Sequence, residues 1–130
     1  MTLTVRIAGD YSVVCRPSEI SQVLMNLLGN SFDAVESQEL KWVTLTVDQN
    51  EGKVNLAVTD SGKGVDTAIV QKIMDPFFTT KGIGRGTGIG LSISKGIAEN
   101  HNGTLSLDTK SKVTRFVLEI PAWLPAKKVA

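Results

Sequence analysis

The chain has 130 residues, of which 42% are hydrophobic and 21% charged, and this size and composition fit one compact domain with a buried core. The formal net charge is +1, with acids and bases interspersed, which argues against a nucleic-acid partner and against direct membrane contact. The single cysteine, Cys15, cannot form an internal disulfide, and no apolar run approaches the roughly 20 residues that cross a bilayer. We therefore expect a cytoplasmic domain, which a membrane-anchored parent protein could carry.

Alternation of apolar and polar residues marks the predicted strands. The alternating stretches are 3–7, 43–48, 54–59, 105–107 and 116–120. Polar segments at 49–52 and 109–112 separate neighbouring stretches, so we expect two hairpins.

Two longer segments have helical patterns. The first runs from Pro17 to about Gln38 and opens with residues typical of a helix start, and the second runs from Gly88 to Asn100 and is ended by Asn102-Gly103. A short stretch over 67–74 adds a helical turn or two. The resulting order is β-β-α-β-β, a glycine-containing loop, then α-β-β. It predicts an α+β sandwich, with a mixed or antiparallel sheet covered by helices on one face.

The first long helix carries a stripe of oxygen-bearing side chains. At about 100° per residue, Asn26, Asn30 and Asp33 fall within a stripe about 60° wide at one edge of the apolar face. Such oxygens near a phosphate site suit Mg²⁺. The alternative is an ordinary solvated helix face, although asparagine is a poor helix former and needs some other reason to stand there.

A second candidate site follows the strand at 54–59. Period two places Asp60 on the same side as the core residues Val54 and Val58, so its carboxylate faces inward and needs a strong donor, such as the exocyclic amine of a purine. Gly62 and Gly64 would let a flat ring pack against the backbone. The alternative is a common Asp-Ser-Gly turn, in which the aspartate side chain bonds its own backbone.

Glycine then occupies every second position from Gly82 to Gly90, directly before the second helix. A backbone without Cβ atoms can approach a ligand closely, and a helix N-terminus attracts phosphate. The spacing fits neither a Walker loop nor a dinucleotide fingerprint. We interpret it as a mobile lid, with Phe77 and Phe78 as its anchor or as plain core residues. Lys81 and Arg85 could reach a γ-phosphate or simply be solvated.

Together these segments resemble the N, G1, F and G2 boxes of the sensor histidine kinases. The matching segments are 26–34, 60–64, 75–81 and 86–92, and the resemblance spans roughly residues 3 to 121. The chain is similar to the catalytic and ATP-binding domain of these kinases, in the superfamily that includes DNA gyrase, Hsp90 and MutL. This implies a Bergerat ATP-binding fold over residues 1–125 with a mobile ATP lid, followed by a frayed tail at 126–130.

The resemblance also implies roles for individual residues. Asn30 would hold Mg²⁺ with help from Asn26, Asp60 would accept from the adenine amine, and Lys81 would be the main cation near the γ-phosphate. Thr114 would contact adenine through water. The implied ATP-binding set is Asn26, Asn30, Asp33, Asp60, Gly62, Gly64, Lys81, Gly86, Thr87, Gly88, Gly90, Leu91 and Thr114, with Asn26, Asn30 and Lys81 as its catalytic members.

Two departures from relatives are informative. Many histidine kinases have a lysine and an aromatic residue where this chain has Asp33-Ala34-Val35, which resembles the subset of nitrogen-regulation and hybrid kinases. ATP-hydrolysing relatives carry a glutamate base at the position of Asn26. An asparagine cannot activate water, so it favours transfer of phosphate to a histidine over hydrolysis.

The phosphoacceptor histidine is expected on a separate dimerisation domain. The chain's one histidine, His101, ends the second helix, where an imidazole suits the helix dipole. We therefore predict an ATP–Mg²⁺ catalytic domain of two-component signalling, whose homodimeric parent passes phosphate to a response regulator and which turns over little in isolation. The alternatives are a serine/threonine kinase of the anti-sigma-factor type and a nucleotide-sensing module without transfer activity.

Overall fold

The computed structural model describes residues 1–64, 72–73, 75 and 90–123. Its elements, in chain order, are β1 (Thr2–Ile7), α1 (Pro17–Val35), β2 (Trp42–Asn50), β3 (Lys53–Asp60), α2 (Gly90–Asn100), β4 (Thr104–Leu107) and β5 (Arg115–Pro121). The tail expected to fray and most of the segment at 67–74 lie outside the described residues, apart from a turn at 72–73 closed by the bond from Asp75 N to Lys72 O.

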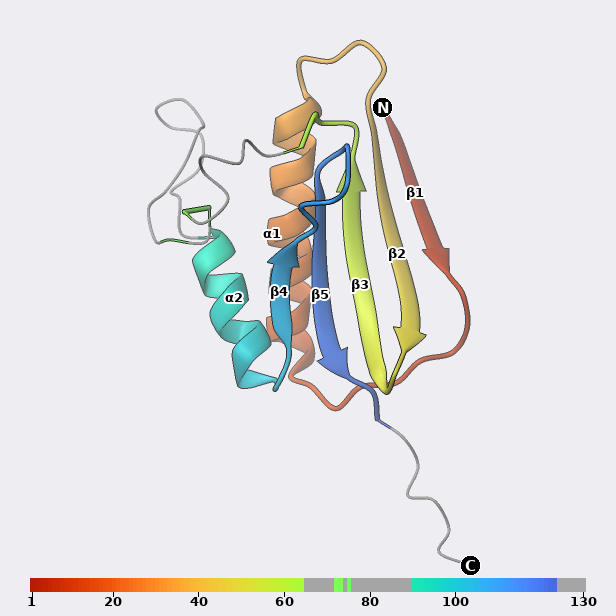
Figure 1. Cartoon of the computed structure of the whole chain (residues 1–130), viewed down its shortest axis with the longest axis vertical. Helices are drawn as coiled ribbons and strands as arrows, with labels where there is room; N and C mark the ends of the chain where they lie inside the picture. Colours follow the sequence, from red (N-terminus) through yellow and green to blue (C-terminus); the bar gives the residue numbers. More distant parts are fainter. Residues whose placement is uncertain (65–71, 74, 76–89, 124–130) are drawn as a thin grey trace, which may run out of the picture.

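The strands form one mixed sheet in the order β1-β2-β3-β5-β4. β1 pairs with β2 in parallel, and the other neighbours are antiparallel. α1 and α2 pack side by side over one face of this sheet (Figure 1). The predicted α+β sandwich is confirmed.

The hairpin between β2 and β3 is tighter than expected. β2 extends to Asn50, so the turn consists of Glu51 and Gly52, with φ of 53° and 77°. Two successive positive φ values are typical of the two-residue hairpin turn whose twist matches that of the strands.

The prediction of two strands before the first helix is wrong. Residues 8–16 form no strand, because pairing with β2 ends at the bond from Ala8 N to Val47 O and the chain then crosses from the sheet to the helical layer. Trp123, two residues beyond the end of β5 (Arg115–Pro121), donates from its backbone N to Ser12 O at 2.7 Å and ties this crossing to the segment that follows β5.

The helix boundaries also differ from the predicted ones. α1 ends at Val35, three residues before the expected Gln38, and the chain leaves it through a turn closed by Gln38 N and Val35 O at 2.9 Å. The described part of the second helix begins at Gly90, and 88–89 lie outside the described residues. Its predicted end is confirmed, since Asn102 has a positive φ of 58° and Gly103 N bonds Ala98 O.

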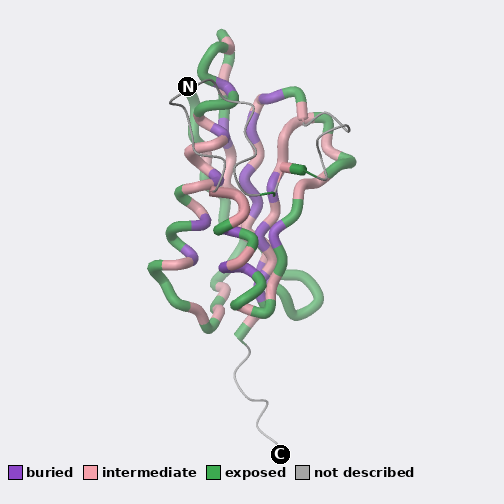
Figure 2. The backbone as a smooth tube through the Cα atoms, turned by 90° about the vertical axis from the view of Figure 1, so that its left-hand side faces the viewer, coloured by how far each residue is buried: buried purple, intermediate pink, exposed green. Residues whose placement is uncertain are grey.

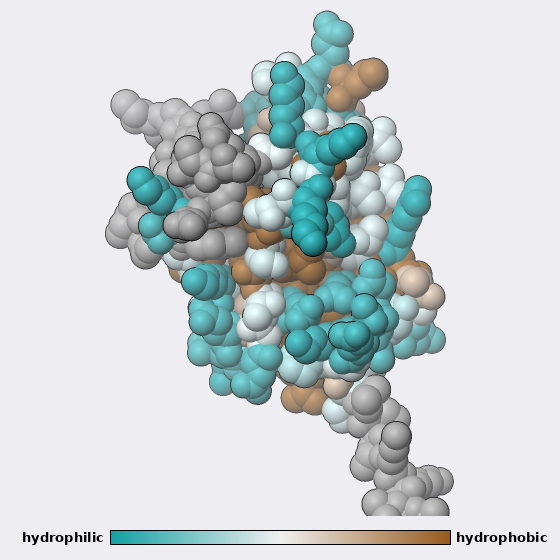
Figure 3. All heavy atoms as spheres, in the orientation of Figure 1, coloured by the Kyte–Doolittle hydropathy of each residue, from teal (hydrophilic) through white to brown (hydrophobic). Residues whose placement is uncertain are grey.

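The core lies between the two helices and the sheet, where the buried residues gather in Figure 2. Its members are Ile20, Val23, Leu27 and Val35 from α1, Ile97 and Ala98 from α2, and Val43, Val58, Leu105, Phe116, Leu118 and Ile120 from the sheet. The opposite face of the sheet shows mainly hydrophilic and neutral residues in Figure 3. Neither described helix has the length and apolar character needed to cross a membrane.

The edge strand β1 is an exception to this pattern of burial. Leu3, Val5 and Ile7 pair in register with Val43, Leu45 and Val47, and therefore point to the helical side, yet they are 51%, 55% and 62% exposed. The helices contact β2, β3, β4 and β5. β1 therefore contributes ladder hydrogen bonds but little core burial.

Candidate nucleotide-binding site

Asp60 ends β3 with its side chain in the core, as its parity predicts. The residue is 1% exposed and pairs with the buried Val43 of β2. Its Oδ1 accepts a hydrogen bond from Gly62 N at 2.7 Å, so the turn that was the alternative interpretation is also present. Oδ2 is buried and has no hydrogen-bond partner among the described residues.

Burial raises the pKa of the Asp60 carboxyl, because the charged form loses solvation. The polar Ser31 side chain and the Gly62 N–H that donates to Oδ1 act in the opposite direction and lower the pKa in part. A buried acceptor without a donor costs free energy. Oδ2 is therefore an atom that a ligand's N–H group would satisfy.

Gly62 and Thr114 lie next to this carboxylate, and Gly64 follows in the same turn. A Cβ at Gly62 would stand 2.7 Å from Oδ1 of Asp60 and 3.0 Å from Oγ1 of Thr114, so there is no room for a side chain. Gly64 has a φ of +84°, which favours glycine. The backbone ties the group together, since Asp60 N donates to Thr114 O at 2.9 Å and Thr114 N donates to Gly62 O at 3.3 Å.

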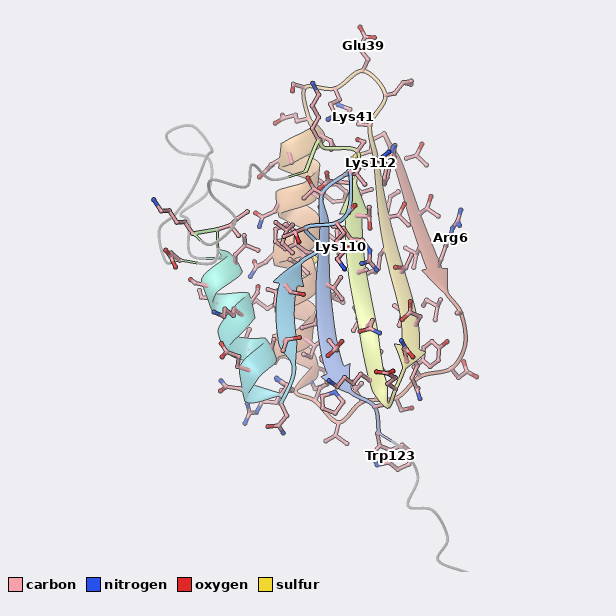
Figure 4. All side chains as sticks on the ribbon, viewed as in Figure 1. Arg6, Glu39, Lys41, Lys110, Lys112 and Trp123 are labelled. Carbon is pink, nitrogen blue, oxygen red and sulfur yellow. The ribbon has the colours of Figure 1, made fainter. Side chains whose placement is uncertain are left out.

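The connection between β4 and β5 completes this end of the site. Gly64 lies close to it, since a Cβ there would be 3.7 Å from the carbonyl oxygen of Lys112. Figure 4 labels Lys110 and Lys112 on this connection. An ion pair between Arg115 and Asp108, 3.0 Å long, closes its base. The hairpin thus forms one wall beside the glycine turn.

A set of hydrogen bonds that fixes the turn after Asp60 was not predicted from the sequence. Ser61 Oγ donates to Gln38 Oε1 at 2.7 Å, and Gln38 Nε2 donates back to Ser61 O at 3.2 Å. The same hydroxyl accepts from Trp42 N at 3.2 Å. Gln38 stands beyond the end of α1, where no periodic pattern could mark it, and the contact spans 23 positions in the chain.

Asn26 joins the two helices. Its Nδ2 donates to the Gly90 carbonyl at 3.3 Å and to Ser94 Oγ at 3.0 Å, so α1 is tied to the first turn of α2. A solvated helix face, the alternative interpretation of this stripe, would not bond a second helix, so Asn26 does not fit that alternative. Asn30 is half-buried and Asp33 is exposed one and two turns further along α1. Ser94, fully buried, was not singled out from the sequence, although a serine on the core side of a helix is a usable signal.

The described part of α2 begins next to Asn26, at Gly90 and Leu91. The first N–H groups of a helix have no partner inside it. The other predicted phosphate-binding residues, Lys81, Gly86, Thr87 and Gly88, lie outside the described residues. So do Phe77, Phe78 and Arg85.

His101 directly follows the far end of α2, about 16 Å from Gly90 along the helix axis. Its Nδ1 is 2.8 Å from Ile97 O, which can only accept, so Nδ1 carries the proton. Its Nε2 accepts from Arg16 N at 3.1 Å. Nδ1 thus fixes the ring on the end of α2, and Nε2 holds the entry of α1 against it, which supports a structural role for His101.

Comparison with known proteins agrees with this layout. Residues 15–124 match the family described as histidine kinase-, DNA gyrase B-, and HSP90-like ATPase. The chain belongs to this family, and within it to the catalytic domains of sensor histidine kinases. It is 34% identical over 115 residues to the two-component sensor PprA of Pseudomonas aeruginosa, and 36% identical over 110 residues to the sensor histidine kinase ZraS of Escherichia coli.

A solved structure of the catalytic domain of the histidine kinase ThkA, in a nucleotide-free form, is similar in fold and sequence. The TM-score is 0.79 at 33% identity, covering 92% of this chain and 79% of that one. The mycobacterial sensor histidine kinase MprB, at 22% identity and a TM-score of 0.81, shares the fold. The chain spans 12% of the length of PprA and 22% of ZraS, although 84% of it is matched in each.

Proposed function

We propose that the chain binds ATP with Mg²⁺ and positions the γ-phosphate for transfer to a histidine on a separate dimerisation domain of a sensor histidine kinase. The observation that carries this proposal is the buried Oδ2 of Asp60, which has no donor among the described residues and belongs to a carboxylate beside a glycine turn. The exocyclic amine of adenine is a donor of the required kind. The Thr114 hydroxyl, next to the same turn, supports adenine contact through water.

The phosphates would lie between α1 and the N-terminus of α2. Asn26 lies on that side, bonded to Gly90 and Ser94 of α2, and Asn30 follows it one turn further along α1. No cluster of three or more His, Cys, Asp or Glu side chains exists in the described part of the chain. Amide oxygens and phosphate oxygens are suitable Mg²⁺ ligands. We therefore assign the metal to Asn30 with help from Asn26, while Lys81 and Gly86 to Gly88 remain predicted phosphate contacts.

The chemistry in this proposal is positioning and charge neutralisation. When bound, Mg²⁺ neutralises charge on the phosphates. Asn26 carries no basic group and cannot activate water, so the site favours transfer over hydrolysis. His101 has both ring nitrogens in backbone hydrogen bonds, so the acceptor histidine must come from elsewhere. The parent kinase would be a homodimer with a cytoplasmic catalytic domain, and a response regulator would take the phosphate from the acceptor histidine.

The test has two steps. Calorimetric titration with ATP and Mg²⁺ should give saturable binding, which Asn30→Ala should weaken at least about tenfold because a metal ligand is lost. The domain is then mixed with radiolabelled ATP and the histidine-bearing helical domain of a related kinase. Acid-labile label on that domain supports the proposal, whereas acid-stable label on serine, or binding without any transfer, would contradict it.

A further inference from the structure

The side chain of Asn26 is held in one orientation by α2. A primary amide nitrogen has two hydrogens, and Nδ2 has two acceptors, Gly90 O and Ser94 Oγ. A carbonyl oxygen can only accept, so the amide nitrogen, and not Oδ1, bonds these two acceptors. Oδ1 takes no part in either bond and is the atom of this side chain that is left for a ligand.

Ser94 supplies the shorter of these two bonds, at 3.0 Å against 3.3 Å. The residue is fully buried, so its hydroxyl cannot be replaced by water without opening the interface between the helices. Gly90 contributes only its backbone, and a Cβ there would stay in ordinary contact with the Asn26 amide, at 3.7 to 3.9 Å. Among the side chains of α2, Ser94 is therefore the one that fixes the amide.

We propose that Ser94 is a positioning residue, which holds the Asn26 carboxamide with Nδ2 on α2 and Oδ1 directed to the Mg²⁺ and phosphates of ATP. The inference rests on the proposed function, since it deepens the role of a residue in that site. The same bond links α1 to the helix whose N-terminus is predicted to bind phosphate. Ser94 thereby sets the spacing between the metal side and the phosphate side of the site.

The test uses a matched pair, Ser94→Thr and Ser94→Val. Threonine and valine have nearly the same shape, so both add the same volume at a buried position and differ in the hydroxyl. We expect Ser94→Val to bind ATP with Mg²⁺ about three- to tenfold more weakly than Ser94→Thr, the range for loss of one net hydrogen bond. With EDTA in place of Mg²⁺, the two variants should bind ATP within about twofold of each other.

A second measurement needs no nucleotide. In ¹⁵N spectra the Asn26 side-chain amide should keep its wild-type shift and slow exchange in Ser94→Thr, and move with faster exchange in Ser94→Val. Equal Mg²⁺–ATP affinities, or an unmoved Asn26 signal, would overturn the inference. If Ser94→Val does not fold, Ser94→Ala against wild type replaces the pair.

Failure of the proposed function is a different result. If the wild-type chain does not bind ATP with Mg²⁺, the assignment of the nucleotide site fails. The Asn26 signal in the unliganded variants still decides whether Ser94 orients the amide.

Discussion

Replacing Gly62 by alanine should disrupt the adenine end of the candidate site. The added Cβ would stand 2.7 Å from Asp60 Oδ1 and 3.0 Å from Thr114 Oγ1. Neither neighbour can retreat easily, because Asp60 is 1% exposed and Thr114 is tied through its backbone to both Asp60 and Gly62. Overpacking of this kind costs about 2 kcal/mol of folding free energy. The displaced carboxylate should also weaken ATP binding at least about tenfold.

Urea unfolding followed by circular dichroism gives the stability, and calorimetric titration gives the ATP affinity. Gly96→Ala is the matched control, because a Cβ at Gly96 meets no heavy atom within 4 Å. That change should stabilise α2 by up to about 1 kcal/mol and leave ATP binding within about twofold of wild type. Wild-type stability and affinity in Gly62→Ala would refute the argument that the turn is filled by the carboxylate and the Thr114 hydroxyl.

Two further predictions concern the fold. Leu118→Ala should lower the free energy of unfolding by about 2–5 kcal/mol, since Leu118 is fully buried in β5. Val5→Ala should lower it by less than about 0.5 kcal/mol, since Val5 is 55% exposed. Equal losses for the two variants in urea unfolding would contradict this difference in burial. His101→Ala should lower the free energy of unfolding by about 1–2 kcal/mol through loss of the bonds to Arg16 N and Ile97 O, with ATP affinity kept within about twofold. A large loss of ATP affinity with unchanged stability would show that His101 belongs to the nucleotide site.

The strands were predictable because alternation reports directly which side chains face the core. Val43, Val54 and Val58 are buried as their parity requires, and the same rule placed Asp60 inward. The rule gives no information on residues 8–16, where the chain crosses between layers and the contacts are isolated. Alternation also could not show that the helices leave β1 largely uncovered, although this strand is apolar on the side that faces the helical layer.

The site was predictable where its residues are neighbours in the chain or carry family motifs. Asp60, Gly62 and Thr114, which the family motifs pick out, lie together in the structure, and Asn26 contacts Gly90. The supporting residues Ser31, Gln38 and Ser94 were missed. Each acts through a partner in another element, at a separation of 23 positions for Gln38 and Ser61 and of 68 for Asn26 and Ser94. The helix or strand propensity of a residue depends on its local sequence and contains no information on such contacts.

Asp60→Asn should separate stability from ligand binding. Burial raises the pKa of the Asp60 carboxyl above its ordinary value of 3.8, so between the unfolded and the folded pKa the folded state binds more protons than the unfolded state. Stability therefore falls as the pH rises through that window, and the loss persists at neutral pH. Asparagine is neutral, and its Oδ1 can still accept from Gly62 N.

The unliganded Asp60→Asn chain should accordingly be more stable than wild type at pH 7, by about 1 kcal/mol, within the range that single stabilising substitutions commonly give. The gain should shrink as the pH falls below the ordinary carboxyl pKa, where wild-type Asp60 is protonated in both states. Asp108→Asn is the control with opposite sign, because backbone hydrogen bonding from Lys110 lowers the pKa of Asp108. ATP affinity of Asp60→Asn should drop at least about tenfold, since the new amide places a donor against the adenine amine. A variant that is less stable at every pH and still binds ATP normally would show that the buried carboxylate is structural and recognises no adenine.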